Sequence, residues 1–238
     1  MEQFIRSEML LGSEAMEKLR SAHVAVVGVG GVGGFSVEAL VRAGVGEITI
    51  VDNDKISRSN LNRQIAALHS TLGQFKAEAA AARALDINPH VIVHPRVLLY
   101  SADNRESFFN ASYDYIVDAI DLVSCKLDLI ISAKERNIPI ISALGVGNKL
   151  DPGQLCVTDI SKTQSCPLAR VIRKELRDRG ILHHKVIYSS EPALKPLPME
   201  QPPPGRRSIP GSVSWVPGAA GLMLAGEAIK DILGINGT

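Results

Sequence analysis

The sequence predicts an α/β protein with a Rossmann-like, doubly wound, mostly parallel sheet and an elaborated C-terminal segment. Two observations support this fold class. Short apolar runs alternate with helical patterns over the first two thirds of the chain. A glycine-rich turn with the sequence GVGGVG, at 28–33, follows the first apolar run, and Asp52 follows the second run, nineteen residues after Gly33.

The first βαβ unit is expected at 23–51. The apolar run at 23–27 has the length and composition of a buried strand. Apolar residues at helical spacing predict a helix over 31–43, and the run EITIV at 47–51 is the expected second strand. Strand, glycine turn, helix and strand in this order form a unit whose crossover should be right-handed.

Helices and strands continue to alternate after this unit. An alanine-rich helix is expected at 74–86, because Asn88-Pro89 stops it. The other expected elements are a helix at 122–136 and strands at 91–97, 115–119, 139–144 and 154–159. This alternation favours a mostly parallel, doubly wound sheet.

The chain changes character after residue 161. A basic helix is expected at 168–179 and a strand at 184–189, whereas 191–210 contains seven prolines and is expected to be a long loop. An apolar helix at 215–233 ends before Gly234. We expect one domain over 1–238, with a nucleotide-binding core at 1–160, a basic, proline-rich segment at 161–212 and a C-terminal helix at 213–238.

Composition excludes several classes of protein. Hydrophobic residues make up 45% and charged residues 21% of the 238, as in ordinary globular proteins. No run of eighteen apolar residues occurs and the N-terminus does not resemble a signal peptide, so we expect a cytoplasmic protein without stable membrane insertion. The three cysteines form no CxxC pair, which argues against a disulfide framework and a four-cysteine zinc site.

Charge is distributed unevenly along the chain. Residues 161–212 hold ten Lys or Arg against four Asp or Glu, whereas the other 186 residues hold sixteen against twenty-one. A basic segment on a mildly acidic body predicts a local anionic partner.

The glycine turn predicts a nucleotide site. Gly28, Gly30 and Gly33 allow a tight turn, with backbone N–H groups of the next helix facing a phosphate. Asp52, at the carboxyl end of its strand, is placed to accept hydrogen bonds from ribose hydroxyls. The alternatives are a glycine turn that only permits close helix–strand packing and a carboxylate that caps a nearby turn. Asp54 is expected to be a turn residue.

Cationic and amide side chains follow the acid. Arg63 and Lys76 suit a triphosphate, because phosphoryl chemistry is catalysed mostly by positioning and by neutralising negative charge. Asn60 and Gln64 could orient the phosphates or the substrate. An NAD(P)-binding oxidoreductase remains an alternative, although a nicotinamide cofactor does not require this cluster, and each cation taken singly could be a solvated surface group.

In combination these motifs resemble the ubiquitin-activating-enzyme superfamily, which includes the ThiF and MoeB adenylyltransferases, over about residues 4–160. The matching features are Arg6 with Gly12, the GVGGVG turn, Asp52 with Asp54, Ser59-Asn60 with Arg63-Gln64, Lys76, Ile87-Asn88-Pro89 and Val117-Asp118-Ala119 with Asp121. The resemblance implies adenylation, in which a carboxylate attacks the α-phosphate of ATP and pyrophosphate leaves.

The resemblance also implies roles for single residues. Asp52 would bind ribose, Asn60 and Arg63 would hold phosphates, Lys76 would bind the phosphate chain, and Asp121 would bind Mg²⁺. A helix N-cap is the alternative role for Asp121. Arg6 resembles an arginine that members supply across a dimer interface, which implies a homodimer. The residues expected to bind the nucleotide are Gly28, Gly30, Gly31, Gly33, Asp52, Ser59, Asn60, Arg63, Gln64 and Lys76, and those expected to act in catalysis are Arg6, Arg63, Lys76 and Asp121.

Within the superfamily the chain most resembles the tRNA threonylcarbamoyladenosine dehydratases. The matching phrases lie at 59–64, 117–121, 151–152, 157–159, 162–163, 167–169 and 188–191. This branch dehydrates and cyclises N6-threonylcarbamoyladenosine at position 37 of tRNA through an acyl-adenylate of the threonyl carboxylate. A cysteine desulfurase or sulfur-acceptor system is a further partner that the resemblance suggests. The alternative is an adenylyltransferase that activates the C-terminal Gly-Gly of a sulfur carrier, but such enzymes usually carry two CxxC zinc pairs.

The basic segment then has a candidate partner. The side chains expected to meet the tRNA backbone, near one face of the helix at 168–179, are Arg170, Arg173, Lys174 and Arg177. The alternative is a solvated amphipathic helix. Cys166 lies where thioester-forming relatives place a reactive cysteine, but the dehydratase chemistry needs no thioester and a lone cysteine is more often inert.

Overall fold

The computed structural model describes residues 2–199 and 209–235 and is built around one seven-stranded sheet. The strand order is β3-β2-β1-β4-β5-β7-β6, and every pairing is parallel except that of β6 with β7. The strands are β1 (His23–Val27), β2 (Glu47–Val51), β3 (Ile92–Arg96), β4 (Tyr115–Asp118), β5 (Ile140–Ala143), β6 (Leu155–Asp159) and β7 (Lys185–Ser189). The predicted doubly wound, mostly parallel sheet is confirmed.

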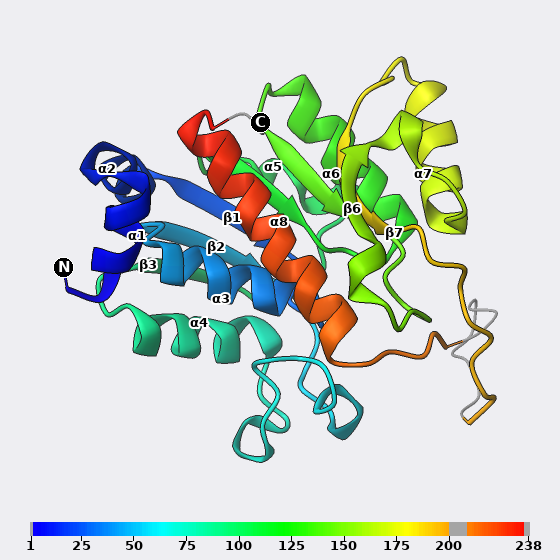
Figure 1. Cartoon of the computed structure of the whole chain (residues 1–238), viewed down its shortest axis with the longest axis horizontal. Coiled ribbons are helices and arrows are strands. Elements are labelled where there is room, and N and C mark those ends of the chain that lie inside the picture. Colours follow the sequence, from blue (N-terminus) through cyan, green and yellow to red (C-terminus); the bar gives the residue numbers. More distant parts are fainter. Residues whose placement is uncertain (1, 200–208, 236–238) are drawn as a thin grey trace.

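Helices cover both faces of this sheet (Figure 1). The helices are α1 (Ile5–Leu11), α2 (Ser13–Ser21), α3 (Gly33–Ala43), α4 (Lys76–Ile87), α5 (Arg105–Phe108), α6 (Val123–Glu135), α7 (Pro167–Arg177) and α8 (Trp215–Leu233). One hydrophobic core joins α3, α4 and α8 to the sheet, and a second joins α5, α6 and α7 to the opposite face. The result is a three-layer α/β/α arrangement.

The central strands form because their side chains are apolar on both faces. Four of the five residues in β1 and in β2, and all four in β4, are buried. Buried parallel strands with helices on both faces require such continuous apolar runs. β3 is at one edge of the sheet, where Pro95 can be accommodated because its missing N–H removes no bond to a central neighbour.

Most of the expected elements agree with the structure within a few residues. The helix predicted at 215–233 is α8, and Gly234 ends it in the left-handed conformation, with φ of 74°. Residues 191–199 and 209–210 form no helix or strand, as the prolines predict, and 200–208 lie outside the described residues. No helix among the described residues is both long enough and apolar enough to cross a membrane.

Three α-helices were not predicted from the sequence, α1, α2 and α5. β7 also has an unexpected position, because this strand of the basic, proline-rich segment inserts between β5 and β6. The antiparallel pairing of β6 with β7 then ends the parallel part of the sheet. The C-terminal third therefore completes the sheet as well as elaborating it.

The contact between α3 and α8 depends on a glycine. A Cβ atom added at Gly221 would lie 2.2 Å from the carbonyl oxygen of Val32, so the two helix backbones approach more closely than alanine permits. Gly226, one and a half turns further along α8, has nothing within 4 Å of such an atom.

We predict that Gly221→Ala and Gly226→Ala change stability in opposite directions. Gly221→Ala should lower the free energy of unfolding by about 1–3 kcal/mol, because overpacking forces the helices apart. Gly226→Ala should raise it by about 0.5–1 kcal/mol, because alanine favours a helix interior. Urea unfolding measures both variants, and equal effects at the two positions would contradict the close contact.

Candidate nucleotide-binding site

A cavity of about 440 Å³ opens at the carboxyl ends of β1, β2 and β4. The strand order reverses between β1 and β4, and in open α/β sheets ligands bind at such a switch point. The cavity has the size of a small-molecule site. The predicted residues that line it are Gly28, Gly30, Gly31, Asp52, Asn60, Arg63, Gln64, Lys76 and Asp121.

The glycine turn brings the start of α3 against the end of β4. Gly28 has φ of 88°, and a Cβ atom there would lie 2.7 Å from the carbonyl oxygen of Ala119. At Gly33 a Cβ atom would lie 1.8 Å from the carbonyl oxygen of Gly28. Close packing therefore explains both glycines. It also leaves the backbone of Gly30 and Gly31 at the cavity wall, where it can approach a phosphate.

Asp52 ties the glycine turn to the end of β2. Its carboxylate accepts hydrogen bonds from the N–H groups of Val29 and Asp54, both at 2.8 Å. Burial raises the pKa of Asp52, and the positive charge of Lys76 and the two N–H donors only partly oppose that effect. Each oxygen keeps a lone pair that can accept from a ribose hydroxyl. The turn-holding role and the expected ribose-binding role are therefore compatible.

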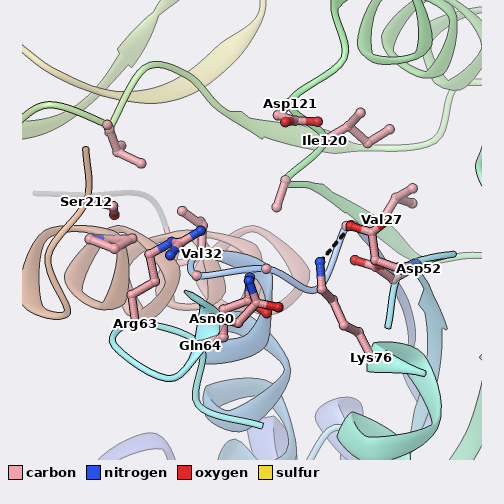
Figure 2. Close-up of a pocket in the computed structure, with 18 of the residues that line it drawn as sticks. Val27, Val32, Asp52, Asn60, Arg63, Gln64, Lys76, Ile120, Asp121 and Ser212 are labelled. Carbon is pink, nitrogen blue, oxygen red and sulfur yellow. Dashed lines mark hydrogen bonds and ion pairs between the residues drawn. The ribbon is translucent and has the colours of Figure 1, made fainter. Parts of the chain in front are cut away.

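Lys76 is the first residue of α4 and one of the few buried cations. Its ammonium donates to the carboxylate of Asp54 at 2.7 Å, and its own backbone N–H donates to the Asp54 carbonyl at 2.9 Å. Asp54, expected only to form a turn, thus also orients the lysine. Figure 2 shows Lys76 and Asp52 at the same end of the pocket.

Arg63 lies toward the other end of the pocket, near Ser212 (Figure 2). Its guanidinium donates to the carbonyl oxygen of Ser59 at 2.8 Å and to the side chain of Asn62 at 2.9 Å. Ser59 itself does not line the cavity, and its hydroxyl pairs with that of Ser57. The carbonyl group of Ser59 therefore positions the side chain of Arg63, which does line the cavity.

Asn60 and Gln64 are buried and line the pocket between these two ends (Figure 2). The side-chain oxygen of Asn60 accepts from the N–H of Ser57 at 3.0 Å, so the amide also fixes the turn that carries Arg63. The pocket therefore has charged groups at both ends and amides between them. This arrangement suits an extended anionic ligand.

Asp121 lies on the wall opposite to Asn60 and Lys76 (Figure 2). The loop that carries it is held by a buried ion pair, in which Lys126 donates to Asp118 at 2.6 Å and neither side chain is exposed. The other oxygen of Asp118 accepts from the N–H of Ile120 at 3.0 Å. The N-cap of α6 is Leu122, so the alternative role of Asp121 as the N-cap is wrong.

The end of the proline-rich segment also lines the pocket, which was not predicted. The lining residues there are Pro210, Gly211 and Ser212. The N–H of Gly211 donates to the side-chain oxygen of Asn148 at 2.6 Å, and the N–H of Asn148 donates to the carbonyl oxygen of Gly211 at 2.8 Å. The side chain of Asn62 donates to the carbonyl oxygen of Ser212 at 3.0 Å. The sequence around Pro210 has no local pattern that predicts a contact with Asn62, which lies 150 residues before Ser212.

Several predicted residues lie outside this pocket. Gly33 is behind its wall, and Arg6 is exposed on α1. On α7, Arg170, Lys174 and Arg177 are exposed, whereas Arg173 donates to the carbonyl and hydroxyl oxygens of Thr163 at 2.8 and 2.6 Å.

The cysteines are free thiols. Cys125 is buried in the core, as expected. Cys166 is buried too, and its sulfur accepts from the N–H of Ala169 at 3.4 Å as the N-cap of α7. That capping contact gives Cys166 a structural role.

The position and side chains of the pocket define a Rossmann-like nucleotide-binding protein with groups for a ribose and for phosphates. Residues 4–238 match the ThiF family, and the chain therefore belongs to that family. It is 40% identical over 240 residues to the tRNA threonylcarbamoyladenosine dehydratase of Bacillus subtilis. The alignment covers 97% of this chain and 94% of the relative.

Solved structures of a second dehydratase share the whole fold. Escherichia coli TcdA in complex with AMP matches with a TM-score of 0.90 and 34% identity, over 98% of this chain and 94% of that one. TcdA has also been solved in complex with ATP, and that structure matches with a TM-score of 0.89 and 33% identity over the same shares.

A relative from another branch matches over a shorter region. The adenylyltransferase and sulfurtransferase UBA4 of Vanderwaltozyma polyspora is 34% identical over 155 residues, which is 65% of this chain and 35% of the relative. The carrier-activating branch is thus more distant than the dehydratases.

We predict that nucleotide affinity depends on the protonation of Asp52. Because burial raises the pKa of Asp52, its carboxylate should take up a proton at a higher pH than an ordinary aspartate. A protonated carboxyl accepts ribose hydroxyls less well, so affinity is complete above this pKa and falls as the pH is lowered through it. Calorimetric titration with AMP at decreasing pH tests this, with Asp52→Asn as the control. A wild type that follows the variant at every pH would contradict the role of Asp52.

Proposed function

We propose that this protein is an ATP-dependent tRNA threonylcarbamoyladenosine dehydratase. It would remove one water from N6-threonylcarbamoyladenosine at position 37 of tRNA and close a ring. The observation that carries this proposal is a single pocket that holds Asp52, Arg63 and Lys76, in a chain similar over nearly its whole length to a named dehydratase. TcdA complexes with ATP and AMP support the nucleotide.

The first step is adenylation. An oxygen of the threonyl carboxylate attacks the α-phosphorus of ATP, the bond to the bridging oxygen breaks, and pyrophosphate leaves. Asp52 would hold the ribose, while Lys76 and Arg63 would neutralise charge that spreads over the phosphate oxygens. Both cations are held by neighbours before the ligand arrives, Lys76 by Asp54 and Arg63 by Ser59, so little reorganisation is needed.

The second step is ring closure. The carbamoyl nitrogen attacks the activated carbonyl carbon, AMP leaves with the oxygen that joined it to the acyl group, and the nitrogen loses its proton. The acyl-adenylate is already reactive and the nucleophile is tethered to it, so proximity supplies much of the acceleration. No thiol is required, which agrees with the buried, capping position of Cys166.

We also propose that Asp121 holds Mg²⁺. Mg²⁺ prefers carboxylate and phosphate oxygens, and Asp121 lies on the wall that faces Lys76 and Asn60. When bound, the ion would counter charge on the phosphates.

The exposed cations of α7 are proposed to hold the tRNA backbone. Arg170, Lys174 and Arg177 are spaced four and three residues apart, which places them on one face of the helix. Arg173 shares this region, but its bonds to Thr163 give it a structural task as well.

A homodimer is proposed because Arg6 does not reach the pocket of its own chain. α1 also exposes large apolar side chains, with Met9 and Leu10 at 76% and 85% exposure. A second copy of the chain would cover these side chains and could bring its Arg6 to the site. Cytoplasmic location and a sulfur-transfer partner stay predictions.

Activation of a sulfur carrier is the weaker alternative. The chain has three cysteines, all free, and two of them are buried, so the zinc pairs usual in that branch are absent. A Gly-Gly carrier that supports exchange between pyrophosphate and ATP would favour this alternative over the dehydratase.

We predict that Arg63→Ala abolishes dehydration of threonylcarbamoylated tRNA without unfolding the protein. The guanidinium lies in the pocket, and its loss removes charge neutralisation worth about 10²–10³-fold in rate. Nucleoside mass spectrometry after incubation with Mg²⁺ and ATP counts the product that is lighter by one water. Arg58→Ala is the matched control, because Arg58 is exposed outside the pocket in the same segment. Full turnover by Arg63→Ala would remove the assignment.

We predict that the double reversal Arg170→Glu with Arg177→Glu weakens tRNA binding. Cations that meet phosphates release counterions, so the variant should bind more weakly at low salt and its affinity should depend less on salt. Lys18→Glu with Arg20→Glu, on α2, changes the net charge equally and serves as the control. Equal losses in both variants would mean that only the total charge matters.

We predict that Arg6→Ala and Arg63→Ala complement each other. Each variant alone should be inactive, whereas a mixture should regain part of the turnover, because a mixed dimer contains one site with both arginines. Full activity of Arg6→Ala, or no recovery in a mixture shown to exchange subunits, would argue against a shared site.

A further inference from the structure

A cluster of metal-ligating side chains lies at the other end of the sheet from the nucleotide pocket. His23 and Glu47 are the first residues of β1 and β2 and pair directly in register, and His94 lies on β3. Strand residues alternate between faces, and Glu47 pairs with Ile92, so His94, two residues further, shares their face. One ligand atom of each side chain lies within 4.8 Å of the others.

The distances in this cluster suit a shared cation. Nδ1 of His23 lies 3.5 Å from Oε1 of Glu47, and Nε2 of His94 lies 2.7 Å from the same oxygen. Two ligand atoms on one tetrahedral Zn²⁺ ion would be about 3.3 Å apart, given ordinary bond lengths of about 2.0–2.1 Å. The first distance already matches. The second requires a small rotation, which the exposed side chains of His94 and Glu47 permit, at 45% and 36% exposure.

A neighbouring hydroxyl orients one of the imidazoles. Nε2 of His23 lies 2.9 Å from Oγ1 of Thr49. Thr49 is fully buried and lies two residues after Glu47 on β2. In the tautomer in which Nε2 donates to this oxygen, the lone pair of Nδ1 points toward the Glu47 carboxylate, so the two groups together can bind a cation. Tyr113 packs its ring edge to face against His23, with centroids 4.9 Å apart, and limits the movement of that imidazole.

We propose that His23, Glu47 and His94 bind a divalent transition-metal ion of the zinc type, which links β1, β2 and β3 across the sheet. Two imidazoles and one carboxylate are a ligand set that zinc accepts, with water in the fourth position. Imidazole ligands favour such ions over Mg²⁺ or Ca²⁺. Among the described residues, no other group of three or more such side chains gathers this closely.

The site is separate from the chemistry of the nucleotide pocket. His23 lies four residues before Val27, which lines that pocket, so about 13 Å of strand separates the two ends of β1. The ion would therefore have a structural role. Binding to the folded chain alone would raise the free energy of unfolding with the logarithm of the free ion concentration, once that concentration exceeds the Kd.

The test is a titration of metal-free, nucleotide-free protein with Co²⁺ and then Zn²⁺. We expect one equivalent of Co²⁺ to give visible absorption without thiolate charge-transfer bands, and Zn²⁺ to displace it. His94→Ala and the near-isosteric Glu47→Gln should lose this binding, and Thr49→Val should weaken it about 10–100-fold through the orientation of His23. Zn²⁺ should raise the thermal midpoint of the wild type but not of His94→Ala.

His183→Ala is the matched control, because His183 also lies beside a carboxylate, 3.4 Å from Asp159, but has no third ligand among the residues that the structure describes. That variant should bind the ion as the wild type does. Binding that survives both His94→Ala and Glu47→Gln, binding with thiolate bands, or no binding would overturn the proposal. AMP formation by His94→Ala should be unchanged, which separates this proposal from the catalytic one.

Discussion

The architecture depends on the close approach of the glycine turn to the end of β4. Gly28 and Gly33 leave no room for a Cβ atom, so the first turn of α3, the end of β1 and Ala119 meet within van der Waals distance. The tight turn leaves space for a ligand at the switch point of the sheet, between β1 and β4, and backbone N–H groups of the turn face that space. Asp52 then fixes the turn from one side and the buried pair of Asp118 with Lys126 fixes the opposite wall. The glycines therefore set the shape of the site, and the charged residues set its chemistry.

Charged groups in this pocket are held before a ligand arrives. Lys76 is paired with Asp54, and the guanidinium of Arg63 is bound to Ser59 and Asn62. A buried lysine costs free energy unless it has a partner, so Asp54 makes the position of Lys76 possible. Such fixed charges stabilise a transition state better than mobile ones because they need not reorganise. The same residues that maintain the turns of 52–64 thus also prepare the site for a triphosphate.

The sequence predicted the strands and the residues around the glycine turn because both follow from local patterns. Apolar runs at 23–27 and 47–51 became β1 and β2 without change of bounds, and Asp52, Asn60, Arg63 and Lys76 meet in one pocket. Ser59 and Gly33 support the pocket from behind, which spacing alone cannot distinguish from lining it. The short helices α1 and α2 were missed because seven and nine residues give only a brief periodic pattern. The placement of 210–212 over the pocket depends on Asn148 and Asn62, contacts that only the folded chain brings together.

The central claim is that the pocket activates a carboxylate by adenylation, and oxygen transfer tests it most directly. Threonylcarbamoylated tRNA labelled with oxygen-18 in the threonyl carboxylate would be incubated with the protein, Mg²⁺ and unlabelled ATP. Adenylation predicts one labelled oxygen in the AMP released, with unlabelled pyrophosphate. Label in orthophosphate, with ADP as the other product, would contradict adenylation and indicate a phosphorylated carboxylate instead.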